Sequence, residues 1–283
     1  MPPLSTLNCF KHIDTISPMT GGLSSQCYRV QADNQCFFAK QIITADEPIF
    51  SINAAKNDLS PHVIYHDKYW LITEFIEGEN LSLSQQTIKT KISIATELMA
   101  KCHQLNRQTN RLLPAHIISE LLVGQPFSAQ QYKSLLEYSL SIITPLKEAK
   151  NTAQNIGQED VFCHGDLNFS NILISKKNKS YLIDFDCACI APAEYDLAMF
   201  IAINNIDEDK IASSIKHYKN HSSCKIDFAL FKHYLQFCYF INGLWYRQAY
   251  QQSGLLKFSQ LTTQQWQHLH CNQPIDLFLT HSL

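Results

Sequence analysis

Glycine is scarce in this sequence. Eight of the 283 residues are glycine, far fewer than the usual share of about 7% would supply. A chain this sparing is expected to keep glycine where the backbone geometry requires it. Gly21 and Gly22 stand together, Gly78 follows a strand-like run, and Gly165 lies between a histidine and an aspartate. These four glycines mark the segments in which we expect function.

A surplus of charge of either sign is also missing. The 23 basic and 25 acidic side chains leave a formal net charge of -2, so no global positive field attracts a nucleic acid or an anionic membrane. No apolar run approaches the roughly 18 residues of a membrane span. The segment before Asp14 has neither the basic nor the apolar region of a secretory signal. We expect a cytoplasmic protein whose partner is neither nucleic acid nor membrane, and the oligomeric state stays open.

The sequence has no C-x-x-C pair, although it contains ten cysteines. They are scattered along a chain that is long enough to fold without disulfide bonds. The nearest pair, Cys187 and Cys189, has no second pair to complete a zinc site. We expect reduced thiols, most of them small buried side chains.

The first part of the chain has the pattern of a small antiparallel sheet with one helix. Two apolar, β-branched runs flank the turn signal at residues 32–34, which predicts a hairpin. A helix is expected to begin at Glu47, because Pro48 is tolerated in the first turn. The expected elements are strands at 27–30 and 35–43, a helix from Glu47 to about Asn57, and strands at 63–66 and 70–74.

The rest of the chain has mainly helical patterns. From Gln85 onward the apolar residues follow helical spacing, and residues 160–186 alone return to strand patterns. We therefore expect an α+β fold with two domains. These are an antiparallel-sheet domain over residues 1–78 and a larger, mainly helical domain over residues 79–283.

The segment at 160–186 carries residues suited to phosphoryl transfer. Residues 172–174 and 181–183 flank a polar turn and are expected to pair, which brings Asn171 close to Asp184. An asparagine and an aspartate that converge in this way supply the oxygen ligands suited to Mg²⁺. Asp166, five residues before Asn171, can reach a hydroxyl group beside the metal and accept its proton.

These motifs resemble a known family. The sequence H-G-D-L-N-F-S-N at residues 164–171 and I-D-F-D at 183–186 resemble the catalytic loop and metal-binding motif of the small-molecule branch of the protein-kinase-like fold. This branch includes aminoglycoside phosphotransferases, choline kinases and thiamine kinases. The resemblance spans roughly residues 20–266. It implies a two-lobed fold, with a small antiparallel-sheet N-terminal lobe and a larger helical C-terminal lobe, and the use of ATP and Mg²⁺.

The resemblance also implies roles for individual residues. Asp166 would be the catalytic base, and Asn171 and Asp184 would be metal ligands. Glu47 lies fourteen residues before Pro61, as the helix glutamate does in choline kinases. The implied nucleotide-binding residues are Gly21, Gly22 and Ser24 over the phosphates, Lys40 on the α- and β-phosphates, Glu47 as its ion-pair partner, and Glu74 and Ile76 in the hinge that would hold adenine.

Two further polar residues near the motifs are expected to serve the structure. A buried histidine is usually a hydrogen-bonded structural residue, so we expect His164 to orient the loop instead of acting as a base. Asp196 is similarly expected to brace the loop.

A polypeptide acceptor is not expected. Only eleven residues separate Asp184 from Asp196, and no A-P-E follows them. This leaves no long segment on which a polypeptide could dock. The acceptor should therefore be a small-molecule alcohol.

An aromatic stretch near the C-terminus indicates a cationic acceptor. Trp245 and Tyr246 belong to a stretch that could surround one cation. Residues 235–256 contain no Asp or Glu to balance the several ammonium groups of an aminoglycoside. Residues 242–254 and 264–266 are similar to the tail of bacterial thiamine kinases. We therefore expect thiamine as the acceptor, contacted by Asp186, Trp245 and Tyr246. Choline or ethanolamine kinase, aminoglycoside phosphotransferase and nucleotide-binding pseudokinase remain the alternatives.

Overall fold

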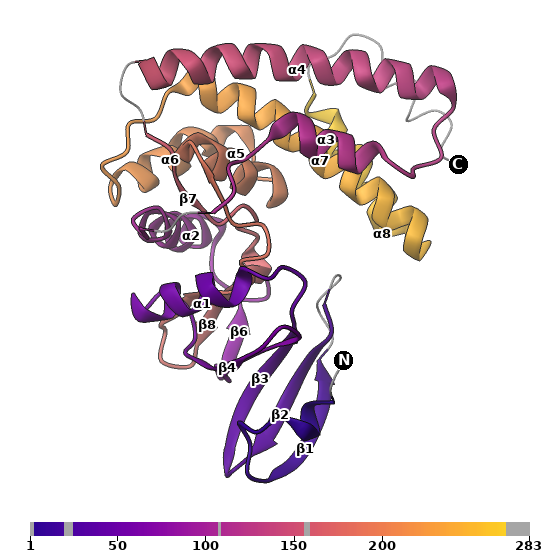
Figure 1. Ribbon diagram of the computed structural model, residues 1–283. Helices are drawn as coiled ribbons and strands as arrows, with labels where there is room; N and C mark the ends of the chain where they lie inside the picture. Colours follow the sequence, from indigo (N-terminus) through magenta and orange to yellow (C-terminus); the bar gives the residue numbers. More distant parts are fainter. Residues whose placement is uncertain (1–2, 20–24, 107–108, 156–158, 270–283) are drawn as a thin grey trace. The chain divides into compact units, whose positions relative to one another are not determined.

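The computed structural model describes residues 3–19, 25–106, 109–155 and 159–269 (Figure 1). The chain forms two compact units, of which the first comprises Met1–Thr109 with His164–Ala188 and the second Asn110–Cys163 with Cys189–Leu283. Each unit is defined by the contacts within it. The domain boundary expected near residue 78 stays a prediction. The expected phosphate-loop residues Gly21, Gly22 and Ser24 lie outside the described ranges.

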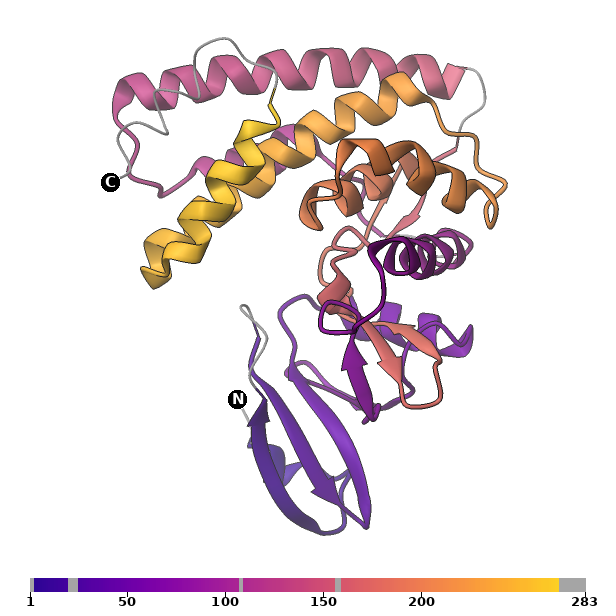
Figure 2. The ribbon, with the colours of Figure 1, turned by 180° about the vertical axis from the view of Figure 1, so that it is seen from behind.

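An antiparallel sheet of five strands forms the N-terminal part of the first unit (Figures 1 and 2). Its spatial order is β1-β2-β3-β5-β4, and every neighbouring pair is antiparallel. The hairpin and the two later strands expected from the sequence are confirmed. The strands are β1 (Ile13–Met19), β2 (Cys27–Ala32), β3 (Gln35–Gln41), β4 (Val63–His66) and β5 (Trp70–Glu74).

The N-terminal segment covers one face of this sheet. Side chains alternate between the two faces of a strand, so Phe37 and Ala39 of β3 share one face and Lys40 lies on the other. The covered face packs Phe37, Ala39, Val30 and Trp70 against Leu4, Leu7 and Phe10. Lys40 therefore points away from this core.

The sequence patterns did not predict β1. This strand pairs with β2 from Ile13 to Met19, and all but its first residue are exposed. Its polar residues and Pro18 hide the strand pattern, because proline cannot donate to a neighbouring strand. The position at the sheet edge explains why Pro18 is tolerated there.

A helix and a second sheet complete the first unit. The predicted helix is α1 (Glu47–Lys56), and the helix expected after Gln85 is α2 (Ile88–Cys102). A three-stranded sheet has the order β6-β8-β9. It consists of β6 (Gly78–Asn80), β8 (Ile172–Ser175) and β9 (Ser180–Leu182). The pairing of β8 with β9 confirms the hairpin expected beside the catalytic motif.

The second unit is mainly helical, as expected. Its long helix α7 (Phe228–Ser253) packs against other helices of this unit (Figures 1 and 2). The partners of α7 are α3 (Pro114–Leu122), α4 (Ala129–Asn155), α5 (Ala193–Ile203) and α8 (Leu256–Gln267). The unit also contains α6 (Glu208–Lys219) and the antiparallel pair β7 (Val161–Cys163) and β10 (Cys189–Ala191).

The described structure confirms the mixed α+β class, with an antiparallel N-terminal sheet and a helical C-terminal region. The nine cysteines in the described ranges are all free thiols. None of the described helices combines the length and the apolar character that a bilayer crossing requires.

Candidate active site

Three carboxylates meet at the ammonium group of Lys40. Lys40 lies on β3, Glu47 is the first residue of α1, and Asp184 and Asp186 follow β9. Lys40 Nζ lies 2.6 Å from Glu47 Oε1, 2.7 Å from Asp184 Oδ1 and 2.7 Å from Asp186 Oδ2. Lys40 and Glu47 are 5% and 1% exposed. We call these four residues the Lys40 cluster.

The Lys40 cluster carries more negative than positive charge. Burial alone would lower the pKa of Lys40, but the nearby Glu47 and Asp184 outweigh it and raise that pKa. Burial raises the pKa of Glu47 to about 8, although the charge of Lys40 opposes the rise. Burial would also raise the pKa of Asp186, but hydrogen bonds from Lys40 and Thr44 lower it. Three carboxyl groups therefore share the single positive charge of Lys40.

Thr44 is a residue of this site that the sequence reasoning missed. Its hydroxyl group donates to Asp186 Oδ1 at 2.8 Å. The pattern Thr44-x-x-Glu47 is a known helix-capping signal and would have predicted a cap for α1. In the structure Asp46 precedes the helix, and the Thr44 side chain instead contacts a segment more than 140 residues away in sequence.

His164 connects the loop of Asp166 to the strand end that precedes Asp184. The backbone amide of Asp166 donates to His164 Nδ1 at 3.3 Å, so a neutral imidazole carries its proton on Nε2. His164 Nε2 lies 3.0 Å from the carbonyl oxygen of Ile183, to which it can donate. The buried ring also packs on Phe185, with centroids 4.8 Å apart. These contacts suit the orienting role proposed for His164.

Asn171 lies against the same loop. Its Nδ2 donates to the carbonyl oxygen and to Oδ2 of Asp166, both at 3.0 Å. The amide oxygen of Asn171 is therefore the atom that a metal could use. The amide of Ile183 donates to the carbonyl oxygen of Asn171 at 3.0 Å, which extends the β8–β9 pairing to the residue before Asp184. This backbone contact is the physical basis for the expected approach of Asn171 to the Asp184 segment.

Two residues of the site have left-handed backbones. Gly165 has φ +79°, and Asp184 has φ 69°. Glycine adopts this conformation without a steric penalty, whereas aspartate is one of the few other residues found there. A non-glycine residue held in this region carries a strain of about 1–3 kcal/mol, which is typical of functional positions.

The predicted hinge residues Glu74 and Ile76 lie at and beyond the end of β5. The Glu74 carboxylate accepts a hydrogen bond from the amide of His62 at 2.9 Å, and the Glu74 amide donates to the His62 carbonyl oxygen at 2.9 Å. Within the described ranges, no hydrogen bond engages the backbone of Ile76. Its amide and carbonyl groups thus remain available for the adenine contact that the resemblance implies.

The predicted acceptor residues Trp245 and Tyr246 belong to the second unit. Tyr246 is buried and stacks on Phe258 of α8, with ring centroids 6.3 Å apart. Trp245 is 39% exposed and lies edge-on to Phe258. Of the two, Trp245 is the residue with surface to offer a ligand. Asp196 is fully buried in α5, consistent with a structural role.

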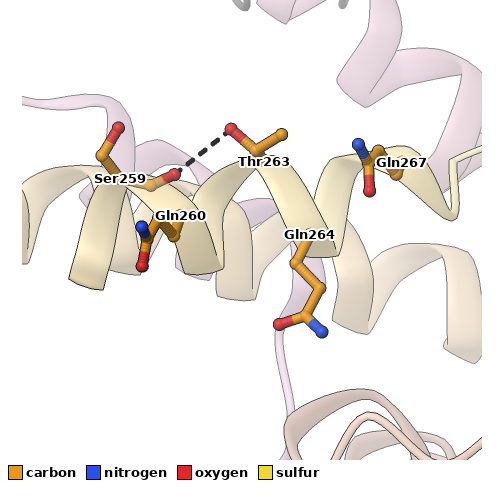
Figure 3. Close-up of a pocket in the computed structure, with 5 residues that line it drawn as sticks. All are labelled: Ser259, Gln260, Thr263, Gln264 and Gln267. Atoms are coloured by element: carbon orange, nitrogen blue, oxygen red, sulfur yellow. Dashed lines mark hydrogen bonds between the residues drawn. The ribbon is translucent and has the colours of Figure 1, made fainter. Parts of the chain in front are cut away.

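A shallow hollow of about 440 Å³ lies on α8 in the second unit (Figure 3). The hydroxyl group of Thr263, one of its lining residues, donates a hydrogen bond to the carbonyl oxygen of Ser259, one turn earlier, at 3.2 Å. The hollow is lined by Ser259, Gln260, Thr263, Gln264 and Gln267. None of these side chains titrates near neutral pH, so the hollow offers no acid or base.

The carboxylates of the Lys40 cluster fit a divalent cation. One ligand atom from each of Glu47, Asp184 and Asp186 lies within 4.8 Å of the others, and carboxylate oxygens are ligands that Mg²⁺ prefers. Glu47 Oε2 is buried and has no hydrogen-bond partner among the described atoms. Such an unsatisfied acceptor usually signals a missing partner such as an ion or a water molecule.

Residues 15–223 match the phosphotransferase enzyme family, APH. The match includes the Lys40 cluster, Asp166 and Asn171. A probable choline kinase of Arabidopsis thaliana, choline kinase 3, is 26% identical over 132 residues, which are 45% of this chain and 37% of that protein. The alignment therefore spans little more than a third of that relative's length.

Solved structures of choline kinases share the fold. The choline kinase LicA of Streptococcus pneumoniae superposes with a TM-score of 0.66 at 16% identity, over 91% of this chain and 95% of LicA; it has also been solved with AMP. A choline/ethanolamine kinase family protein from Mesorhizobium loti superposes with a TM-score of 0.67 at 17% identity, over 89% of this chain and 86% of that protein. At these identities the likeness shows the fold alone. Because the family match covers well over half of its 283 residues, the chain belongs to the phosphotransferase enzyme family.

Proposed function

We propose that this protein transfers the γ-phosphoryl group of ATP to the hydroxyl group of a small cationic alcohol, with Mg²⁺ as cofactor. The observation that carries the proposal is the Lys40 cluster in the same unit as Asp166 and Asn171. A buried lysine with an acidic partner suits phosphate binding, and nearby carboxylates suit a metal.

Lys40 and the hinge are the proposed nucleotide contacts. The ammonium group of Lys40 would bind the α- and β-phosphates, with Glu47 fixing its position at 2.6 Å. The unengaged backbone of Ile76 would bind adenine. The AMP complex of the structurally similar LicA supports a nucleotide as the ligand. Asn171 and Asp184 would hold Mg²⁺, which when bound neutralises negative charge on the phosphates.

Asp166 is the proposed catalytic base. Its Oδ2 accepts a hydrogen bond from Asn171 Nδ2 at 3.0 Å, which fixes the position of the carboxylate. In the proposed step the acceptor hydroxyl gives its proton to the Asp166 carboxylate. The hydroxyl oxygen forms a bond to the γ-phosphorus as the bond to the ADP oxygen breaks. A positioned base of this kind contributes about 10²–10⁴ to the rate.

Thiamine is the first candidate acceptor and choline the second. The tail resemblance favours thiamine, and an exposed Trp245 on an acid-free stretch of α7 supports a single cation over an aminoglycoside. The likeness to a probable choline kinase favours choline or ethanolamine. Because Lys40 and Thr44 hold both oxygens of Asp186, we assign Asp186 to the Lys40 cluster and keep Trp245 and Tyr246 for the acceptor.

An acceptor screen tests the proposal. ADP release from Mg-ATP is measured with thiamine, choline, ethanolamine, homoserine and kanamycin, and mass spectrometry identifies the phosphorylated product. Thiamine is expected to give the highest kcat/KM, and Asp166→Asn should bind ATP but lower kcat by about 10²–10⁴. A highest kcat/KM for kanamycin would contradict a small cationic acceptor. ATP binding without transfer to any alcohol would favour a pseudokinase.

A further inference from the structure

The Lys40 cluster already contains a cation, supplied by the protein itself. The ammonium group bonds one oxygen of each of three carboxylates at 2.6–2.7 Å. The backbone of Lys40 is held in the middle of the sheet, where this residue pairs with Cys27 of β2 and Leu71 of β5. The ammonium group is thus tethered among the same carboxylates whose ligand atoms lie close enough together for a metal ion.

A divalent cation and this ammonium group compete for the same carboxylates. Asp184 and Asp186 each give Lys40 one oxygen, and both oxygens would have to turn toward the metal, whereas Glu47 stays the ion-pair partner of Lys40. A metal added while Lys40 stays in place would also experience the repulsion of a positive charge within a few ångströms. That repulsion is poorly screened inside a protein.

We propose that Lys40 excludes divalent metal from Asp184 and Asp186 until the phosphates of a nucleotide draw its ammonium group away from these two carboxylates. Metal binding is then coupled to nucleotide binding, because each removes an obstacle to the other. The inference rests on the proposed function, since a nucleotide phosphate is the group that takes Lys40. The nucleotide-free enzyme would bind free metal weakly and would fill its metal site together with ATP.

The surrounding contacts hold Asp186 and the segment of Asp184 in place when Lys40 moves. Thr44 donates to Asp186 Oδ1, the oxygen that Lys40 does not use. The backbone pairing of Ile183 with Asn171 fixes the residue before Asp184. When Lys40 moves, Asp186 therefore keeps a side-chain contact of its own, and the residue before Asp184 keeps its backbone hydrogen bond, so the vacated pair offers a metal preset oxygen ligands.

The test measures how tightly Mn²⁺ alone binds to the full chain without nucleotide. The electron paramagnetic resonance signal of free Mn²⁺ reports how much of the ion stays unbound. Wild-type protein should bind weakly. Lys40→Met removes the positive charge with a side chain of similar length and should bind Mn²⁺ at least about tenfold more tightly, given the size of a unit-charge repulsion at this range. Lys179→Met is the matched control, because Lys179 pairs with Asp58 on the surface of the same unit. It should behave as the wild type does.

Thermal unfolding provides a second readout. Lys40→Met leaves three carboxylates without their ammonium group and is expected to be less stable, but Mn²⁺ should raise its midpoint more than that of the wild type. Adding Asp186→Asn to Lys40→Met should remove most of the gain in Mn²⁺ affinity and most of the rise that Mn²⁺ causes in the unfolding midpoint. A Lys40→Met protein that Mn²⁺ neither binds more tightly nor stabilises overturns the inference, and so does tight Mn²⁺ binding by the wild type without nucleotide.

Nucleotide binding separates this inference from the proposed function. Calorimetry of wild-type protein with Mg-ATP, together with ADP release, reports on the proposed function. If wild type binds Mg-ATP and phosphorylates an alcohol while Lys40→Met gains no Mn²⁺ affinity, the exclusion by Lys40 is wrong and the proposed function stands. If wild type binds no nucleotide under any condition, the proposed function fails first.

Discussion

The carbonyl oxygen of Cys187 lies only 2.1 Å from the place where a β-carbon on Gly165 would be. The backbone of the loop that carries Asp166 thus packs directly on the chain that follows Asp186. No other residue fits at Gly165, because the close approach removes the space for a side chain and the positive φ adds strain. This contact sets the distance between the two segments that carry the site.

Gly165→Ala is expected to destabilise the protein and to abolish turnover. The left-handed backbone costs alanine about 1–2 kcal/mol, and the contact with Cys187 forces the two segments apart. Gly124→Ala is the matched control, since Gly124 also has a positive φ but nothing lies within 4 Å of its β-carbon position. Thermal unfolding and ADP release should show a larger loss for Gly165→Ala. Equal effects in the two variants would mean that the close approach has no consequence.

Asp184→Asn should remove Mg-dependent nucleotide binding while preserving the fold. Asparagine tolerates the left-handed conformation of Asp184 but lacks the negative charge of the carboxylate, which the neutral amide of Asn171 does not replace. Asp184→Ala loses the charge and adds backbone strain of about 1–2 kcal/mol, so it should be the less stable of the two. Calorimetry with Mg-ATP measures the affinity. Unchanged affinity in Asp184→Asn would refute the metal assignment.

The stability of the nucleotide-free protein should depend on pH through Glu47. Burial raises the pKa of Glu47 in the folded state to about 8 from an ordinary value of 4.5, so the folded state binds a proton more tightly than the unfolded chain. The resulting stabilisation is complete below about pH 4.5 and is lost as pH rises through about 8. Relative to Glu47→Gln, which cannot titrate, wild type should lose stability between pH 6 and pH 9.

The measurement is the unfolding midpoint of both proteins at the two pH values. The wild-type midpoint minus the Glu47→Gln midpoint should fall by about 5–10 °C from pH 6 to pH 9. With a folded-state pKa of about 8 this change corresponds to about 3 kcal/mol, at about 2–4 °C per kcal/mol in a protein of this size. A difference that grows with pH would mean that Lys40 keeps Glu47 ionised and that its pKa is lowered.

Trp245→Ala should raise KM for the cationic acceptor more than KM for ATP. A partly exposed tryptophan contributes about 0.5–1 kcal/mol to the binding of a cation, so a rise of about 2–5-fold is expected. Trp245→Phe keeps an aromatic face and should recover part of the affinity. Steady-state kinetics with the best acceptor from the screen measure KM for the acceptor and KM for ATP in each variant. An equal rise for both substrates would indicate that Trp245 acts through packing on Phe258.

Much of the first unit could be predicted from local patterns. The hairpin of β8 and β9, and strands β4 and β5, have turn signals and apolar runs that specify them without reference to the rest of the chain. Helix α1 likewise begins at the residue that its proline indicates. Strand β1 could not be predicted, because at the sheet edge the pairing with β2 outweighs a polar sequence that contains Pro18.

The sequence alone determined which residues carry charge, in what order the motifs occur, and that Gly165 stands between His164 and Asp166. Those features suffice for the α+β class and for the family, because they depend on local spacing. Only the tertiary structure decided that Asp186 and Thr44 join Lys40 at one point, since their contacts link residues more than 140 positions apart. It also decided that Tyr246 is buried while Trp245 is not. Both outcomes depend on how separate elements pack, and no local pattern contains that information.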